Sequence, residues 1–122
     1  MKHLTKAEEQ IMKILWQLEE GIVKDILFHL PEPKPAYSTV STVIRILENK
    51  GFVDHRAESY SHIYFPLITE KEYKSFTIDN VMKGFFDNSY QDLLSFLVDE
   101  RKLDLSELEN LTKLIEQLKN KK

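Results

Sequence analysis

The stretch that decides the fold is YSTVSTVIRILENKG, residues 37–51. Successive side chains of a helix lie about 100° apart, so this stretch has one apolar side and one polar side. The apolar side holds Val40, Val43, Ile44 and Leu47, and the polar side holds Ser38, Ser41, Thr42, Arg45, Glu48 and Asn49. The pattern predicts a helix with one side on a core.

The polar side of this helix allows two interpretations. An ordinary surface helix needs nothing more than solvent there, although in a chain this charged Glu and Lys would be the usual residues. Ser, Thr, Arg and Asn are also the side chains that hydrogen-bond phosphates and base edges in DNA. The stretch alone leaves both interpretations open, and the remaining sequence decides between them.

Length and composition exclude several classes of protein. The 122 residues are 42% hydrophobic and 30% charged, which fits one soluble domain, or one small domain with an oligomerisation element. There is no Cys, so disulfides and thiolate metal sites are excluded. No signal peptide and no apolar run of about 18 residues occur. We therefore expect a cytoplasmic protein.

Charge gives no general nucleic-acid signature. The net charge is −3, and residues 1–68 carry 8 Lys and Arg against 9 Asp and Glu. Residues 69–122 carry 9 against 11. Any contact with DNA must therefore come from a local concentration of positive charge.

The first helix has a clear start. Thr5 and Glu8 form a capping box, and an apolar stripe follows up to Leu18. Gly21 is expected to end this helix. Residues 22–23 are expected to form a strand stub.

A second, short helix is expected over residues 24–30, followed by PEPKP at 31–35. Three prolines in five residues end the helix and stiffen the chain. An SH3-type ligand is an alternative reading of this run, but a rigid connection between two helices is the simpler one.

Two β-prone segments, residues 52–56 and 63–67, follow residue 51. They predict an antiparallel hairpin with Pro66 at a strand end. The tip lacks Gly, so a loop longer than two residues is expected. Helix, stub, helix, helix and hairpin is the order of a winged helix, whose last helix enters the major groove.

From residue 69 onward the pattern is helical, with helices expected over 69–86, 90–100 and 104–118. Thr69 with Glu72 forms a second capping box, and Ser89 is a natural N-cap. These helices carry more apolar surface than 54 residues can bury, which indicates a partner. We expect homodimerisation through Phe76, Val81, Phe85, Phe86, Leu93, Leu94, Leu97, Leu108, Leu111, Ile115 and Leu118.

The expected fold is therefore mainly α with a small β-hairpin. It consists of a winged helix-turn-helix DNA-binding domain, residues 1–68, followed by a three-helix dimerisation domain, residues 69–122. No catalytic residues, cofactor or metal site are expected. There is no Gly-rich phosphate loop, no H-E-x-x-H pair, and no carboxylate spaced with a His or Ser for acid–base or nucleophilic work.

Several motifs together resemble the BlaI/MecI/CopY family of bacterial repressors. They are LTKAE and IMKILW at 4–8 and 11–16, TVSTVI at 39–44 with Leu47 and Lys50-Gly51, Tyr64, Ser89 with LLSF at 93–96, and LDLSEL at 103–108. Each motif is weak alone, whereas their order and spacing are specific.

The resemblance implies a winged-helix homodimer that binds a dyad operator. Without Cys the copper branch of the family is excluded, which leaves the branch regulating antibiotic resistance. In that branch a membrane-bound metalloprotease sensor triggers cleavage between an Asn and a Phe. Here Phe96 matches the Phe, but Ser95 stands in place of Asn; Tyr37 stands where many members have Trp.

The residues expected at DNA follow from this layout. Ser41, Thr42 and Arg45 are expected to read base edges, and Thr39, Asn49 and Lys50 to contact phosphates. The hairpin would add His55, Arg56, Tyr60, Ser61 and His62, although plain surface is an alternative for the His residues. A rival function is a winged-helix module that binds protein and no DNA, which the acidic balance favours.

Overall fold

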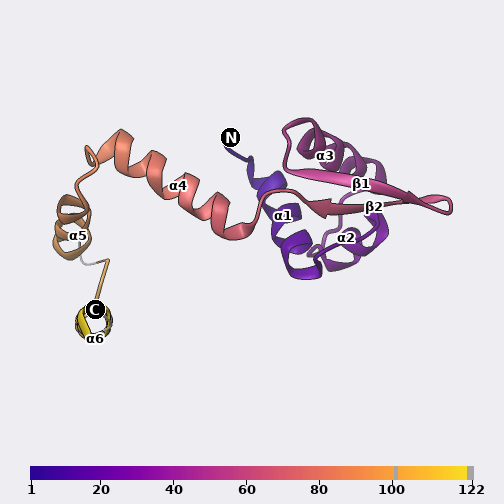
Figure 1. The fold of residues 1–122 in the computed structure, drawn as a ribbon. Helices are drawn as coiled ribbons and strands as arrows, with labels where there is room; N and C mark the ends of the chain where they lie inside the picture. The colour runs from indigo at the N-terminus through magenta and orange to yellow at the C-terminus, as the bar shows by residue number, and fades with distance from the viewer. Residues whose placement is uncertain (101, 121–122) are drawn as a thin grey trace. The chain divides into compact units, whose positions relative to one another are not determined.

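The computed structural model describes residues 1–100 and 102–120 and is mainly helical with one antiparallel hairpin (Figure 1). The chain divides into two compact units, Met1–Thr77 and Ile78–Lys122. The elements are α1 (Lys6–Leu18), α2 (Val23–His29), α3 (Tyr37–Asn49), β1 (Val53–Glu58), β2 (Ser61–Pro66), α4 (Glu70–Phe85), α5 (Tyr90–Asp99) and α6 (Leu105–Asn120).

The start of α1 is as expected, but its end is not. The Thr5 hydroxyl accepts a hydrogen bond from the Glu8 amide at 3.2 Å, and the Glu8 carboxylate accepts one from the Thr5 amide at 2.9 Å. The predicted stop at Gly21 is wrong, because Glu19 ends the helix with φ of 72°. Gly21 instead exchanges two backbone hydrogen bonds of 2.9 Å with Tyr64. The strand stub expected at residues 22–23 is therefore wrong, because Val23 already begins α2; the bridge at Gly21 joins the α1–α2 connection to β2 instead.

The end of α3 depends on Gly51. Gly51 has φ of 82°, in the left-handed region that favours glycine. Its amide donates to the Glu48 carbonyl at 3.0 Å, and the Phe52 amide donates to the Leu47 carbonyl at 2.9 Å. These are the two hydrogen bonds of a Schellman motif, and they set the direction in which the chain enters β1.

The hairpin is longer and its turn tighter than the sequence predicts. The strands pair from Val53 opposite Pro66 to Glu58 opposite Ser61, which leaves only Ser59 and Tyr60 in the turn. Ser59 takes a φ of 56° without being glycine, so the expectation of a longer loop is wrong. In Figure 1 the tip projects beyond α2 and α3.

The first unit has a closed hydrophobic core. Trp16 Nε1 donates to the Ile68 carbonyl at 2.8 Å, and the Tyr73 hydroxyl accepts from the Leu4 amide at 2.9 Å. These contacts hold the start of α4 against α1, so this unit extends past residue 68. The core consists of Ile11, Met12, Ile14, Leu15, Val23, Ile26, Leu30, Val40, Ile44, Leu47, Phe52, Val53, Tyr64 and Tyr73.

The second unit has well-capped helices and little buried surface. The Ser89 hydroxyl accepts from the Asp92 amide at 3.1 Å, and the Asp104 carboxylate accepts from the Glu107 amide at 2.8 Å. Among the described residues of this unit, Met82 is the one buried hydrophobic side chain. None of the helices in the described ranges has the length and apolar character needed to cross a bilayer.

Candidate nucleic-acid interface

Helix α3 has the two sides that its sequence predicts. Val40, Ile44 and Leu47 are at most 1% exposed and fix the helix on the core. The opposite side is open to solvent. Among the residues expected at DNA it carries Thr39, Thr42, Arg45 and Asn49, all exposed, with Ser41 half-buried at its edge.

The hydrogen bonds on this outer side run within the helix. The Thr42 hydroxyl donates to the Ser38 carbonyl at 2.9 Å, and Arg45 Nη2 lies 3.4 Å from the Ser41 hydroxyl. Within the described part of the chain, no carboxylate lies within ion-pair distance of Arg45, whereas Lys50, His55 and Arg56 each have one. The Arg45 guanidinium is therefore a cation available to a ligand.

Lys50, in contrast, is held inside the fold. Its ammonium lies 2.7 Å from a carboxylate oxygen of Glu8, a side chain that is buried at the start of α1. Burial by itself would raise the pKa of Glu8, but the hydrogen bonds from Lys50 and from the Thr5 amide outweigh it, and the pKa lies below its usual value. The pair joins the C-terminal end of α3 to the N-terminal end of α1.

The hairpin residues expected at DNA also have partners within the unit. The Arg56 guanidinium donates two hydrogen bonds, of 3.1 and 2.7 Å, to the Glu20 carboxylate. These hydrogen bonds raise the pKa of Arg56 and lower that of Glu20. Tyr60, Ser61 and His62 are exposed at the tip and the first part of β2.

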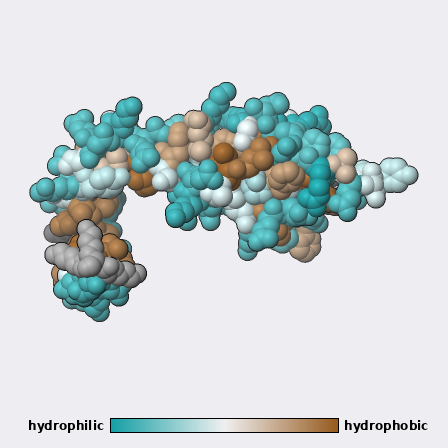
Figure 2. Space-filling model, viewed as in Figure 1, coloured by the Kyte–Doolittle hydropathy of each residue, from teal (hydrophilic) through white to brown (hydrophobic). Residues whose placement is uncertain are grey.

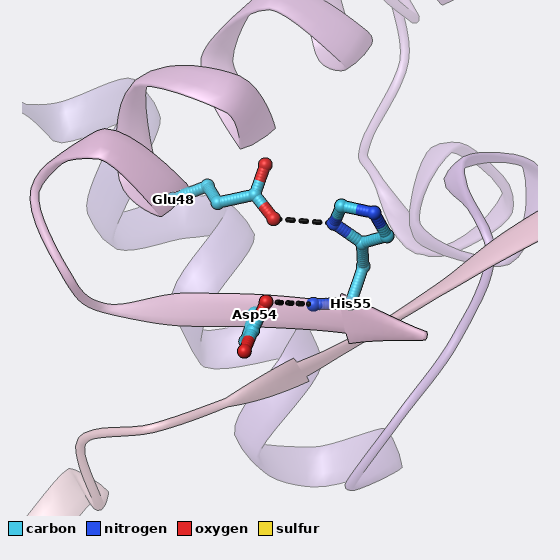
Figure 3. Close-up of side chains that lie close together, drawn as sticks. All are labelled: Glu48, Asp54 and His55. Carbon is cyan, nitrogen blue, oxygen red and sulfur yellow. Dashed lines mark hydrogen bonds and ion pairs between the residues drawn. The ribbon is translucent and has the colours of Figure 1, made fainter. Parts of the chain in front are cut away.

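His55 connects the hairpin to α3. Figure 3 shows its ring nitrogen Nδ1 turned toward the Glu48 carboxylate, while Asp54 accepts a hydrogen bond of 2.8 Å from the His55 backbone amide. The His55 ring stacks on that of His62, with centroids 4.3 Å apart. The wing is therefore fastened to the last turn of α3 by a side-chain pair.

Glu48, Asp54 and His55 are also the one group among the described residues whose donor atoms could converge on a metal ion, all lying within 4.8 Å of one another. Carboxylate and imidazole donors suit zinc or manganese. However, Nδ1 of His55 is already engaged by Glu48 and Asp54 is exposed. The contacts of these three residues show that they connect α3 to the hairpin.

A cleft of about 470 Å³ lies between α3, the start of α2 and the hairpin. It contains both a cation, Arg45, and a carboxylate, Glu48, and burial together with the Glu48 charge raises the pKa of Tyr64 at its wall. Its lining residues are Ile22, Val23, Lys24, Tyr37, Ser41, Arg45, Glu48, His55, Tyr60, Ser61, His62 and Tyr64. Six predicted DNA-contacting residues are among them.

The residues expected in a dimer interface lie in different surroundings. Phe76 belongs to the first unit, with its ring 5.0 Å from that of His3 and 6.0 Å from that of Tyr73. The others lie in the second unit, where hydrophobic surface is visible over the helices in Figure 2. Val81, Phe85, Leu94, Ile115 and Leu118 are exposed, whereas Phe86, Leu93, Leu97, Leu108 and Leu111 are half-buried.

The possible cleavage site lies within a helix. Ser95 and Phe96 are both in α5 and both exposed. The Phe96 ring packs edge-on against Phe86 with centroids 5.8 Å apart. The scissile bond expected from the resemblance is therefore part of ordered structure.

Sequence reasoning missed some residues that shape this interface. Lys24 and Tyr37 line the cleft, and Glu8 and Glu20 hold two of the cations expected at DNA. Ile46 is exposed on the outer side of α3. Counting along the helix places Ile46 beside Thr42 and Asn49, so its exposed position could have been predicted from the sequence.

Three helices followed by a hairpin, with the polar side of the third helix free, define the winged-helix class of DNA-binding proteins. Within that class the match is specific, because the sequence profile of the Penicillinase repressor family covers residues 4–117. The chain belongs to the Penicillinase repressor family. It is a DNA-binding transcriptional repressor and not an enzyme.

Relatives of established name match over almost the whole chain. The Methicillin resistance regulatory protein MecI of Staphylococcus aureus (strain N315) is 24% identical over 113 residues, 92% of each chain. The Penicillinase repressor of Bacillus licheniformis is 22% identical over 120 residues, 98% of this chain and 94% of that protein.

Solved structures match the first unit. The DNA-binding domain of the repressor BlaI, solved in solution, has a TM-score of 0.52 at 26% identity, covering 60% of this chain and 94% of that one. Monomeric BlaI of Bacillus licheniformis, in complex with the blaP half-operator, has a TM-score of 0.50 at 25% identity, covering 59% and 89%.

Proposed function

We propose that the chain represses transcription as a homodimer that binds a palindromic operator, with α3 of each copy in the major groove of one half-site. The observation that carries the proposal is the outer side of α3, where polar side chains and the Arg45 guanidinium, which has no ion pair among the described residues, are open to solvent. Such groups match the hydrogen-bonding pattern of base edges. A bacterial repressor meets its operator in the cytoplasm, so we expect the chain there.

Roles are proposed for the individual residues of α3. Arg45, Thr42 and Ser41 read base edges, and Thr39 and Asn49 contact phosphates at the margins of the groove. Lys50 is a weaker candidate for a phosphate contact, because leaving Glu8 would uncover a buried carboxylate. Its proposed role is to orient α3 and to add positive charge near the backbone of DNA.

The hairpin is proposed to lie along the DNA backbone. Tyr60, Ser61 and His62 are exposed near its tip and contact the sugar-phosphate chain or the minor groove. His55 and Arg56 are paired with Glu48 and Glu20, so their proposed contribution is to hold the wing in place. Few free cations then serve each copy, which makes a second copy important for affinity.

Dimerisation is proposed to occur through the second unit. The exposed apolar residues of α4, α5 and α6 support it, because a chain that leaves such surface in water usually covers it with a partner. The solved complex of monomeric BlaI with a half-operator supports an operator built of two half-sites. Relatives match over this unit as well.

Relief of repression is proposed to follow cleavage of the second unit between Ser95 and Phe96, triggered by a membrane-bound metalloprotease sensor. The support is the resemblance of residues 93–96 to the family's cleavage region. Cutting there would separate two DNA-binding units that were tethered, and tethering contributes about 10²–10⁴ in affinity. Each unit alone would then leave the operator.

Footprinting on the promoter of the chain's own gene tests the operator proposal. We expect two protected half-sites about one helical turn apart, and Arg45→Ala to weaken binding by about 1–3 kcal/mol while relaxing the preference at one base. Thr69→Ala, in the capping box of α4, is the matched control and should leave the base preference unchanged. Protection of a single half-site by the full chain would contradict the palindromic operator.

Salt dependence tests the rival interpretation of a module that binds protein alone. A DNA-binding protein releases counterions, so the logarithm of its affinity for random duplex falls linearly with the logarithm of salt concentration. We expect such a slope for this chain. A flat response together with capture of no duplex at low salt would favour the protein-binding module.

A further inference from the structure

One apolar side chain stands on the otherwise polar outer side of α3. Ile46 is 41% exposed, whereas Val40 and Ile44 of the same helix are at most 1% exposed. At about 100° per residue, Ile46 falls on the same side as Thr42 and Asn49. It therefore belongs to the surface that α3 offers to a ligand and adds nothing to the core.

Thr42 lies one turn before Ile46, where side chains of a helix are neighbours. The Thr42 hydroxyl donates its proton to the Ser38 carbonyl at 2.9 Å. This leaves Thr42 its methyl group and an oxygen lone pair for a partner. Thr42 and Ile46 thus form a short apolar strip. An apolar group of a ligand can pack against it, and the Thr42 hydroxyl has no free proton to donate there.

Arg45, the cationic residue of α3, lies at a different edge of this surface. The Arg45 guanidinium lies 3.4 Å from Ser41, and both residues line the cleft beside the hairpin. Ile46 is not among the residues that line that cleft. The outer side of α3 is therefore divided into a hydrogen-bonding edge and an apolar edge.

Thymine is the base that presents an apolar group in the major groove, its 5-methyl, and aliphatic side chains bind it there. We propose that Ile46, together with the Thr42 methyl, reads a thymine methyl in each half-site and is a specificity-determining residue of this repressor. The proposal rests on the reading role proposed for α3. It adds a contact of a kind that the polar residues cannot make.

The test starts by finding a site for the full-length chain. Selection from a random duplex library yields the preferred motif, and each thymine of the motif is then replaced singly by deoxyuridine, which removes the methyl group and nothing else. At one thymine per half-site we expect a loss of about fourfold in affinity. This corresponds to about 0.8 kcal/mol for one buried carbon, at 1.4 kcal/mol per tenfold.

In the variant Ile46→Ala the preference for thymine over deoxyuridine at that position should fall well below fourfold, because only the Thr42 methyl remains to contact the base. Alanine favours the helix, so the fold is retained. Leu67→Ala is the matched control, because Leu67 is 52% exposed in the same unit and lies outside α3. It should keep the fourfold preference for thymine.

The outcomes separate this inference from the function on which it rests. A selected motif in which no thymine is sensitive to deoxyuridine, or a sensitivity that is undiminished in Ile46→Ala, overturns the role of Ile46 and leaves the repressor function intact. If Arg45→Ala and Ile46→Ala both select the same motif as the natural chain, the reading role of α3 fails, and this inference fails with it.

Discussion

The two units of this chain bury their apolar side chains to very different degrees. In the first unit residues from α1, α2, α3, both strands and α4 meet in one core. In the second unit α5 has no buried residue, and side chains such as Phe85, 83% exposed, face solvent. The first unit therefore has a hydrophobic core of its own, whereas the second leaves its apolar side chains open to the second copy proposed above.

Local sequence signals do not cause this difference. The same capping box begins α1 at Thr5 and α4 at Thr69, and Asp104 with Glu107 repeats it before α6. Both units therefore specify their helices equally well. The difference lies in tertiary packing. In the first unit, distant elements of the chain cover the apolar side of each helix, and in the second unit they do not.

The largest expected effect comes from placing charge on the exposed apolar side of the second unit. The double variant Phe85→Glu with Leu94→Glu should turn dimer into monomer and lower operator affinity by about 10²–10⁴, the usual gain from tethering. Sedimentation velocity and gel shifts measure the two effects on one sample.

The first unit offers a matched control for this variant. Phe28 and Leu67 are 76% and 52% exposed, similar to the 83% and 46% of Phe85 and Leu94. Phe28→Glu with Leu67→Glu should remain a dimer. If both double variants stay dimeric, the proposed interface is wrong.

The second prediction compares one apolar truncation in each unit. Ile44→Ala removes a fully buried side chain and should lower the free energy of unfolding by about 3 kcal/mol at any protein concentration. Leu94→Ala should cost stability only where the dimer is populated, because that is where Leu94 would be buried. Urea unfolding at several concentrations distinguishes the two, and a concentration-independent loss for Leu94→Ala would contradict the comparison.

The third prediction concerns the ion pair between α1 and α3. A carboxylate whose pKa is lowered in the folded state stabilises the fold above its unfolded pKa of about 4.3, and this contribution is lost as the pH falls through the lower folded value. Glu8→Gln should therefore cost about 2 kcal/mol at pH 7, and the difference from the natural chain should shrink in acid below about pH 4.

Unfolding curves of both proteins between pH 3 and pH 7 measure this change. Glu9→Gln removes the same charge from the same turn of α1, where the structure gives Glu9 no ion pair among its described neighbours. That control should stay within about 0.5 kcal/mol of the natural chain. A constant loss for Glu8→Gln across the pH range would mean that its charge is not what stabilises the fold.

The smallest expected effect is at the end of α3. Gly51→Ala places a side chain at φ of 82° in otherwise open space, so backbone strain of about 1 kcal/mol is the expected loss of stability. Ala57→Gly in β1 serves as the comparison, because the backbone at Ala57 is not left-handed. An increase in melting temperature for Gly51→Ala would contradict the strain.

Much of the fold could be predicted because its signals are local. The sides of α3, the capping boxes at Thr5 and Thr69, the N-cap at Ser89 and the place of Pro66 at a strand end all depend on residues within a turn or two. Glycine gave mixed results: Gly51 ends its helix region, whereas Gly21 does not, because Glu19 adopts the left-handed conformation first. The tight hairpin turn was not predicted because Ser59, like Glu19, adopts a left-handed conformation without being glycine.

The candidate site was harder to predict because its cations are paired across long separations. Lys50 meets Glu8 42 positions away, and Arg56 meets Glu20 36 positions away. No periodicity or spacing announces such pairs, so the sequence could not tell the paired cations from Arg45. The half-burial of Phe76 within the first unit was unpredictable for the same reason, because Phe76 contacts His3, a residue far away in the sequence.

If the chain is cut between Ser95 and Phe96 as proposed, the position of this bond inside α5 affects how long the repressor survives. A protease that cuts folded protein acts on the small fraction in which the segment is transiently open. Opening α5 breaks its backbone hydrogen bonds, such as that from the Glu100 amide to the Phe96 carbonyl at 2.9 Å, and the Phe86 contact. If two copies bury this helix between them, the dimer opens less often than the monomer. The repressor's half-life would then lengthen with its own abundance.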